Sequence, residues 1–231
     1  MLESILHFLD INTVMFTLRG PAINFLGVAI PSWIYPMSYI EFFGTIFTGW
    51  CVWLAGKNKT ITWFIGTLGI LLYGYLYYQI QLYSDLIEQV YYLISGFLGW
   101  VLWAKPKTKI SKNSPKLNIT LALGIIVATF GMTYIMSHIH IWLPNVFPVE
   151  ASFPFLDAFT TVMSFVANIL LAYKKIENWY LWIIVDVIGV WLYFVKGVPF
   201  ISLLYLLFLI NAIYAYIQWK KGKVEYVPKT V

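Results

Sequence analysis

Residues 178–196 read NWYLWIIVDVIGVWLYFVK, an apolar run interrupted in its interior by one charged residue, Asp186. A helix needs about 20 predominantly apolar residues to cross a bilayer core of about 30 Å, and this run is long enough. A charged side chain at mid-bilayer costs about 2.5–3.5 kcal/mol on insertion scales, so it is a functional candidate. The stretch therefore predicts a membrane-spanning helix in which Asp186 has a function.

Six more apolar runs accompany this one, which predicts seven spans in all. They cover residues 38–56, 60–80, 84–104, 117–138, 155–173 and 199–219. All ten prolines lie outside these runs or at their first residues, and Pro154 and Pro199 are placed to begin helices. No run alternates polar and apolar residues in the manner of an outer-membrane barrel. We therefore expect an all-α integral membrane protein.

The overall composition excludes several other classes of protein. The chain is 61% hydrophobic and 11% charged, where a soluble domain has about 25% charged residues. Its net charge of +5 does not indicate nucleic-acid binding, because Arg19 is the one arginine and the lysines form short clusters between apolar runs. A single cysteine, Cys51, excludes a multi-cysteine metal site. With no phosphate-binding glycine loop and no Ser/His/Asp set, we expect no enzymatic activity, cofactor or metal.

Residues 1–37 form a separate N-terminal segment. The pattern of Leu2–Leu18 is compatible with one amphipathic helix, which Arg19, Gly20 and Pro21 then interrupt. We expect an interfacial helix followed by a re-entrant or surface segment, rather than an eighth full span.

Lysine placement predicts the orientation. Lysines lie between predicted helices at positions 57 and 59, between 105 and 116, at 174 and 175, and again after 219. All of these positions fall on one side of a seven-span protein, and only Arg19 and Lys196 fall on the other. Because cytoplasmic loops are rich in lysine and arginine, we expect the tail of residues 220–231 in the cytoplasm.

The chain also contains an internal repeat. A shift of 116 residues places residues 41–103 on 157–219 without a gap and aligns Trp63 with Trp179 and Trp103 with Trp219. This predicts a first bundle at 38–104, a basic loop and linker helix at 105–140, and a second bundle at 155–219 in the same orientation. For the middle helices a shift of 119, pairing Trp63 with Trp182, remains a rival. Parallel repeats are typical of transporters with a site near the midplane; a scaffold or channel built by duplication is the structural alternative.

Several polar residues are predicted to face a shared interior, since lipid cannot satisfy their hydrogen bonds. At about 100° per residue, Asn178, Trp182 and Asp186 fall within one arc of their helix. Helix geometry and composition add five further candidate site residues: Asn168, Asn211, Trp50, Gln81 and Tyr205.

Structural interpretations compete with these functional ones. Asp186 could be a protonated acid bonded to a neighbouring helix. Asn168 and Asn211 could form interhelical hydrogen bonds, worth about 0.6 kcal/mol each. Trp63, Trp179 and Trp219 are expected in the aromatic belt at the membrane interface. Trp182, one turn from Asp186 on its polar arc, is expected to contact a ligand.

Tryptophan rings, amides and one carboxylate together suit a flat, polar ligand, including a cationic one. Indole rings stack on such a ligand and attract positive charge, at roughly 0.5–2 kcal/mol each. Amides and hydroxyls can bind ribose hydroxyls or a carboxamide, and one carboxylate offsets a cation.

The motif NWYLWIIVD at 178–186 closely resembles the PnuC family of bacterial vitamin transporters. Tyr193, Lys196-Gly197 and the Leu-Leu-Tyr of 203–205 add to the resemblance, which covers about residues 38–219. It implies a fold like that of the SWEET sugar transporters, with three helices, a linker helix and three more. By position in the motif, Asn178, Trp182 and Asp186 are the first choices for the binding site.

The resemblance also implies a function. It implies uptake of nicotinamide riboside, a vitamin B3 precursor for NAD synthesis, by facilitated diffusion across the bacterial inner membrane. A cytoplasmic nicotinamide riboside kinase would then prevent its return. Another flat vitamin such as thiamine is the alternative cargo, and a non-transporting membrane scaffold is the alternative class. The aromatic, lipid-facing surfaces are compatible with a monomer or a homo-oligomer.

Overall fold

The fold is taken from a computed structural model of the chain. It describes residues 2–25, 28–30, 32–79, 83–105, 109–145, 147–148, 150, 153–195 and 199–222.

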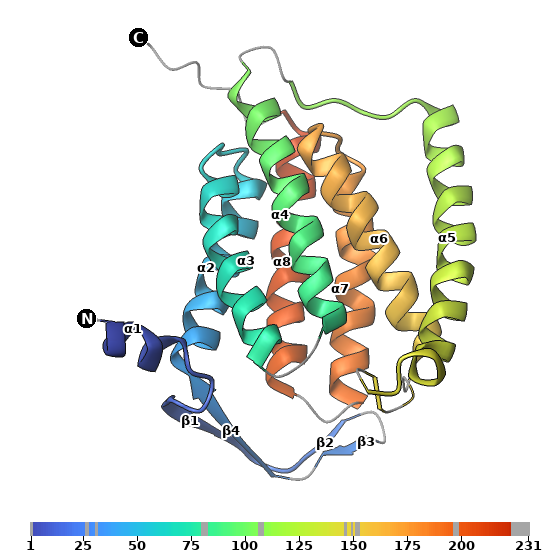
Figure 1. Cartoon of the computed structure of the whole chain (residues 1–231). Helices are drawn as coiled ribbons and strands as arrows, with labels where there is room; N and C mark the ends of the chain where they lie inside the picture. Colours follow the sequence, from blue (N-terminus) through green and yellow to red (C-terminus); the bar gives the residue numbers. More distant parts are fainter. Residues whose placement is uncertain are drawn as a thin grey trace.

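In the part of the chain that the structure describes, seven long helices run side by side (Figure 1). They are α2 (Tyr39–Gly56), α3 (Thr62–Gln79), α4 (Tyr83–Ala104), α5 (Pro115–Trp142), α6 (Pro154–Ala172), α7 (Asn178–Val195) and α8 (Pro199–Lys220). The expected helix starts at Pro154 and Pro199 are confirmed, because the fixed φ of proline suits the first helical position. By length and hydropathy α5, α6, α7 and residues 201–220 of α8 meet the requirements of a membrane span among the described residues. The protein is a multi-pass helical membrane protein.

The helices pack in sequence order and then across two seams. Helix α3 packs between α2 and α4, and α7 between α6 and α8. The two sets meet where α2 packs on α8 and α4 packs on α6. Helix α5 lies at the edge, along α6 (Figure 1).

Four tryptophans hold the two sets together at one end of the bundle. Trp103 and Trp219 are 1% and 2% exposed. The Trp103 Nε1 donates to the carbonyl of Ala172 at 3.1 Å, and the Trp219 Nε1 to that of Gly56 at 2.9 Å. Ala172 and Gly56 are the last residues of α6 and α2, where helix carbonyls lack an intrahelical partner. Each indole therefore satisfies a helix end in the opposite set.

This burial corrects the expectation of an aromatic belt. Trp63 and Trp179 are buried as well, and each packs edge-on against the tryptophan of its own set: Trp63 on Trp103 and Trp179 on Trp219, both with ring centroids 5.4 Å apart. The amine of Lys174, in the loop after α6, lies 4.5 Å from the centroid of the Trp103 ring, and burial lowers its pKa to about 8. Trp63, Trp179 and Trp219 are thus core residues.

The N-terminal segment departs from the sequence prediction. Helix α1 covers Leu2–Leu9, shorter than the expected Leu2–Leu18. It ends where the Asp10 side chain accepts a hydrogen bond from the Asn12 amide at 2.9 Å, a local turn that competes with helix. Four short strands follow: β1 (Val14–Gly20), β2 (Ile23–Phe25), β3 (Val28–Ile30) and β4 (Trp33–Ser38). The all-α prediction is wrong here.

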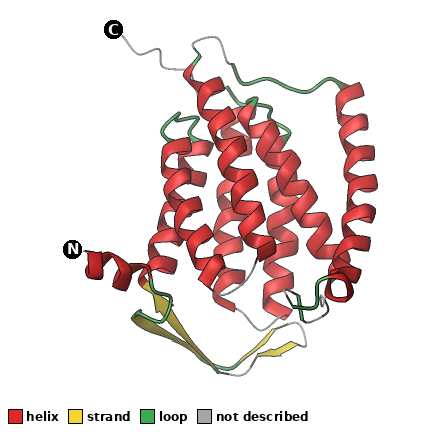
Figure 2. Cartoon of the chain, in the orientation of Figure 1, coloured by secondary structure: helices red, strands yellow, loops and turns green. Residues whose placement is uncertain are grey.

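The strands form two antiparallel pairs, β1 with β4 and β2 with β3. They lie at the end of the helix bundle away from the C-terminus (Figure 2). β-Branched and aromatic side chains such as Val14 and Phe16 favour a strand. Gln79, the last residue of α3, holds α1 in place by accepting from the Ile11 amide and donating to the Leu9 carbonyl.

Trp219→Phe is expected to destabilise the protein. The phenyl ring keeps most of the apolar burial but leaves the Gly56 carbonyl without its donor, at a cost of about 1–3 kcal/mol. The apparent melting temperature of the purified protein should fall by several degrees. Trp100→Phe, at an indole that is 42% exposed on α4, is the control. A fall of the same size in both variants would contradict the role of the Trp219 hydrogen bond.

Candidate functional site

The polar arc of α7 faces the interior of the bundle. Asn178 and Asp186 are 0% and 4% exposed, whereas Ile184 and Val187 are exposed on the opposite side of the helix. Trp182 is half-buried between two apolar clusters, one around the four tryptophans and one around Met163. The arc is therefore directed at protein and not at acyl chains.

Asp186 is the ionisable group of this arc and lies at one end of it. Within the described part of the chain, its carboxyl group has no hydrogen-bond or ion-pair partner. A buried charge without a partner is costly, and a carboxylic acid without one leaves polar atoms unsatisfied. The structural interpretation of Asp186, as a protonated acid bonded to a neighbouring helix, therefore lacks a bonding partner among the described residues.

Aromatic residues from four helices gather around Tyr205, which lies near this carboxyl group. The phenol of Tyr205 on α8 interacts electrostatically with Asp186 and Tyr193 on α7, and with Tyr77 on α3 and Tyr92 on α4. Its ring stacks on that of Tyr193 with centroids 5.2 Å apart. Both sets of helices thus contribute to the site.

Gly189 makes this arrangement possible. A Cβ atom at position 189 would lie 2.3 Å from Cδ1 of Tyr205, so no other residue fits without displacing the ring. In this conformation the Tyr205 ring fills the space one turn from Asp186.

Asn178 lies at the other end of the arc. Its position eight residues before Asp186 puts it about 12 Å away along the helix axis, with Trp182 halfway between. Its Nδ2 donates to the Lys175 carbonyl at 2.6 Å, and its Oδ1 is buried without a partner among the described residues.

The two remaining asparagines bridge the sets of helices. Asn168 on α6 donates to the Ser95 hydroxyl of α4 at 2.7 Å. Asn211 on α8 donates to the Val52 carbonyl of α2 at 3.1 Å. These contacts favour the interhelical alternative for both residues in this conformation.

Of the two other candidates, one is exposed and one is not described. Trp50 is 47% exposed on α2. Gln81 lies outside the described residues.

Sequence reasoning missed the α4 side of the interior. Thr161 donates to a Glu88 carboxylate oxygen at 2.8 Å, and the Tyr91 hydroxyl donates to the Phe165 carbonyl at 2.7 Å. Glu88, Tyr91 and Ser95 recur at helical spacing, and this pattern could have identified the polar face of α4.

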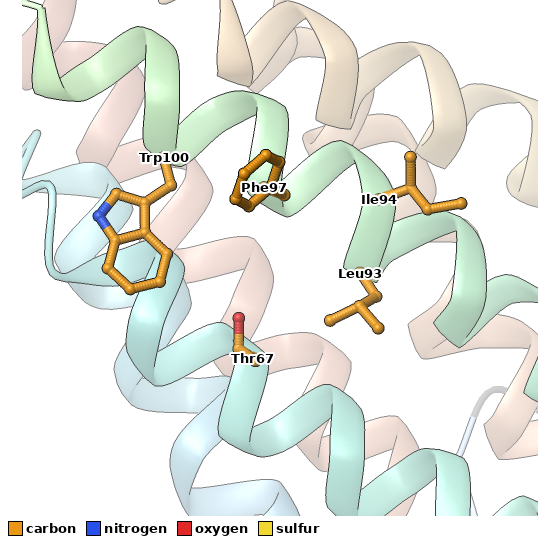
Figure 3. Close-up of a pocket in the computed structure, with 5 residues that line it drawn as sticks. All are labelled: Thr67, Leu93, Ile94, Phe97 and Trp100. Atoms are coloured by element: carbon orange, nitrogen blue, oxygen red, sulfur yellow. The ribbon is translucent and has the colours of Figure 1, made fainter.

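One hollow in the described part of the chain lies away from the arc. A recess of about 430 Å³ between α3 and α4 is lined by Thr67, Leu93, Ile94, Phe97 and Trp100 (Figure 3). Its one hydroxyl, on Thr67, is already bonded to the Trp63 carbonyl at 2.8 Å. The recess therefore offers apolar surface and lacks the polar groups that orient a ligand. Among the described residues, no group of three His, Cys, Asp or Glu side chains could hold a metal ion.

Asp186→Leu and Asn168→Leu are expected to change stability in opposite directions. Removing a buried carboxyl group without a partner should raise the apparent melting temperature, as is common at functional sites. Replacing Asn168 deprives the Ser95 hydroxyl of its donor and should lower it, by about 1–3 kcal/mol of stability. Thermal unfolding of the ligand-free protein measures both. Equal destabilisation would mean that Asp186 is a structural group.

Comparison with known proteins identifies the family. The family described as nicotinamide mononucleotide transporters matches residues 38–221, which leaves out the N-terminal segment. The nicotinamide riboside transporter PnuC of Escherichia coli K12 is 31% identical over 209 residues, covering 80% of this chain and 86% of that protein. The PnuC protein of Neisseria mucosa is 27% identical, covering 85% and 78%.

A solved structure agrees on the fold. The crystal structure of the vitamin B3 transporter PnuC superposes with a TM-score of 0.60 at 23% identity, covering 79% of this chain and 81% of that one. The resemblance stated from the residue 178–186 motif is thereby confirmed. The chain belongs to the PnuC family.

Proposed function

We propose that this protein carries nicotinamide riboside across the membrane. Its relatives in Escherichia coli and Neisseria mucosa are named as nicotinamide riboside transporters. This cargo is a flat pyridinium cation attached to a ribose. It needs an aromatic surface, a negative charge and hydrogen-bonding groups, which are the groups found on the α7 arc.

The observation that carries the proposal is the buried carboxyl group of Asp186, which lies near Tyr205 and has no hydrogen-bond or ion-pair partner among the described residues. A bound cation would satisfy the carboxylate, and the same cation is attracted to the faces of Trp182 and Tyr205. The free Oδ1 of Asn178 is suited to accept from a ribose hydroxyl or a carboxamide. Trp50 has no support in this conformation, and Gln81, which lies outside the described residues, stays a prediction.

We further propose seven spans arranged as two parallel three-helix repeats, joined by α5. Equivalent contacts at a shift of 116 residues support this architecture. The bond from Trp103 to Ala172 corresponds to that from Trp219 to Gly56. The Asn168–Ser95 and Asn211–Val52 bonds also occupy equivalent positions.

Contacts at the starts of the middle helices, α3 and α7, favour the shift of 116 over the shift of 119. The Thr62 amide donates to the Lys59 carbonyl as the Asn178 amide does to the Lys175 carbonyl. The left-handed residues of the two preceding loops, Asn58 at φ 54° and Lys174 at φ 52°, also differ by 116 positions.

Transport would proceed by alternating access between the two repeats. The tryptophan bonds join the repeats at one end of the bundle in this conformation. This lysine-rich end carries Lys57 and Lys59 after α2 and Lys174 and Lys175 after α6. We place it, with the C-terminus, in the cytoplasm. Opening towards the cytoplasm then requires the Trp103 and Trp219 bonds to break. A bacterial inner-membrane location and trapping of the cargo by a cytoplasmic kinase complete the proposal.

Binding by the purified protein tests the cargo and the site together. Nicotinamide riboside should raise the apparent melting temperature, and thiamine should not. Trp182→Ala should weaken nicotinamide riboside binding at least about tenfold, or about 1.4 kcal/mol, because a stacking surface is lost. Trp191→Ala, on the exposed side of α7, is the matched control.

Stabilisation by thiamine alone would identify the other vitamin as cargo. No stabilisation by either compound would favour the scaffold alternative. Equal effects of Trp182→Ala and Trp191→Ala would exclude stacking on Trp182.

Uptake into sealed vesicles tests the mechanism. Because we expect facilitated diffusion, labelled nicotinamide riboside should equilibrate into protein-containing vesicles without a sodium or proton gradient. Vesicles holding Asp186→Asn protein serve as the control and should take up less. Strict dependence on an imposed gradient would refute uniport.

A further inference from the structure

A second recess, of about 420 Å³, lies at the lysine-rich end, on another side of α7 from the Asp186 arc. It is bordered by the first turns of α5 and α7 and the last turns of α6 and α8. Tyr180 lines it from α7 and stands on the exposed side of that helix, opposite Asp186. The recess therefore belongs to the outer surface of the protein and not to the transport path.

Positive charge dominates one part of this recess. Lys112 and Lys220 both line it, and both interact electrostatically with the phenol of Tyr216. The Lys220 amine lies 5.5 Å from the centroid of the Tyr216 ring. Over the residues that the structure covers, neither lysine forms an ion pair. Two amines that converge in this way suit a phosphate group.

A buried acceptor lies in the same recess. Glu177 lines it, and its Oε2 atom is buried without a hydrogen-bond partner among the described residues. A buried carboxylate oxygen needs a donor, and leaving it unpaired is costly. The chemistry of the recess thus calls for a group that is anionic in one part and a hydrogen-bond donor in another.

An apolar surface leads away from this polar part. Leu121 of α5 and Leu181 of α7 form part of the recess. From Tyr180 an exposed stripe follows α7 through Ile184 and Val187 towards mid-membrane. Hydrocarbon covers such a stripe in a membrane protein, so a ligand with an acyl chain would contact both parts.

We propose that this recess binds a glycerophospholipid whose headgroup carries a hydrogen-bond donor, as in phosphatidylglycerol and phosphatidylethanolamine. The phosphate lies between Lys112 and Lys220, and the headgroup hydroxyl or ammonium donates to Glu177. The acyl chains follow the stripe on α7. The lipid belongs to the leaflet on the lysine-rich side and links α5, which otherwise packs mainly on α6, to the ends of α7 and α8. This proposal does not depend on the identity of the cargo.

Lipid selectivity of the wild-type protein is the first test. Phosphatidylglycerol and phosphatidylethanolamine, added to the full chain in mixed detergent micelles, should each raise the apparent melting temperature by roughly 3 °C more than phosphatidylcholine. Phosphatidylcholine has the phosphate but no donor. Glycerol 3-phosphate, which lacks the acyl chains, should have no effect at the same concentration. Equal stabilisation by phosphatidylcholine, or by glycerol 3-phosphate, would overturn the proposal.

Variants test whether the lipid-dependent rise in melting temperature comes from this recess. Lys112→Ala combined with Lys220→Ala should abolish the lipid-dependent rise, whereas Lys57→Ala with Lys59→Ala removes the same charge from another basic loop and should keep it. Glu177→Gln retains an acceptor for a hydroxyl but loses the charge that attracts an ammonium. It should reduce the effect of phosphatidylethanolamine more than that of phosphatidylglycerol. Loss of the rise in the Lys57/Lys59 variant, or its retention in the Lys112/Lys220 variant, would exclude this recess.

Discussion

A carboxyl group that is buried among membrane helices and has no partner in the described protein is the constraint on which the rest depends. Hydrocarbon gives Asp186 no hydrogen bonds, and α8 places the ring of Tyr205, stacked on Tyr193, near it. Natural membrane helices keep such a costly group where a ligand or ion completes it. The aromatic surroundings specify the missing partner further, since rings attract a flat cation and repel an anion.

The remainder of the fold leaves this group free by satisfying polar groups elsewhere. At the lysine-rich end, Trp103 and Trp219 satisfy the helix ends of the opposite set of helices. Nearer the middle, Asn168 and Asn211 join the two sets through Ser95 and Val52. These bonds lie in pairs that differ by 116 positions, so the two sets of helices are joined at equivalent points.

The sequence predicted well whatever depends on hydrophobicity and proline. The seven long helices, the helix starts at Pro154 and Pro199 and the inward arc of α7 all follow from these patterns. It failed at tryptophan, because an indole suits an interface and a core equally and only tertiary contacts separate the two. Trp179 and Trp219 were expected at the interface, and tertiary contacts place them in the core.

The sequence prediction also failed at Val14–Gly20, where a local turn at Asp10 and pairing with β4 override helical periodicity. The partners of Asn168 and Asn211 lie on other helices, which no spacing within one helix reveals.

A structure of the protein with nicotinamide riboside bound tests the central claim most directly. The account predicts the pyridinium ring stacked on Trp182, with its positive charge beside the Asp186 carboxylate and the ribose directed towards Asn178. Density for the ligand elsewhere, with Asp186 bonded to a protein group in place of the cation, would contradict it.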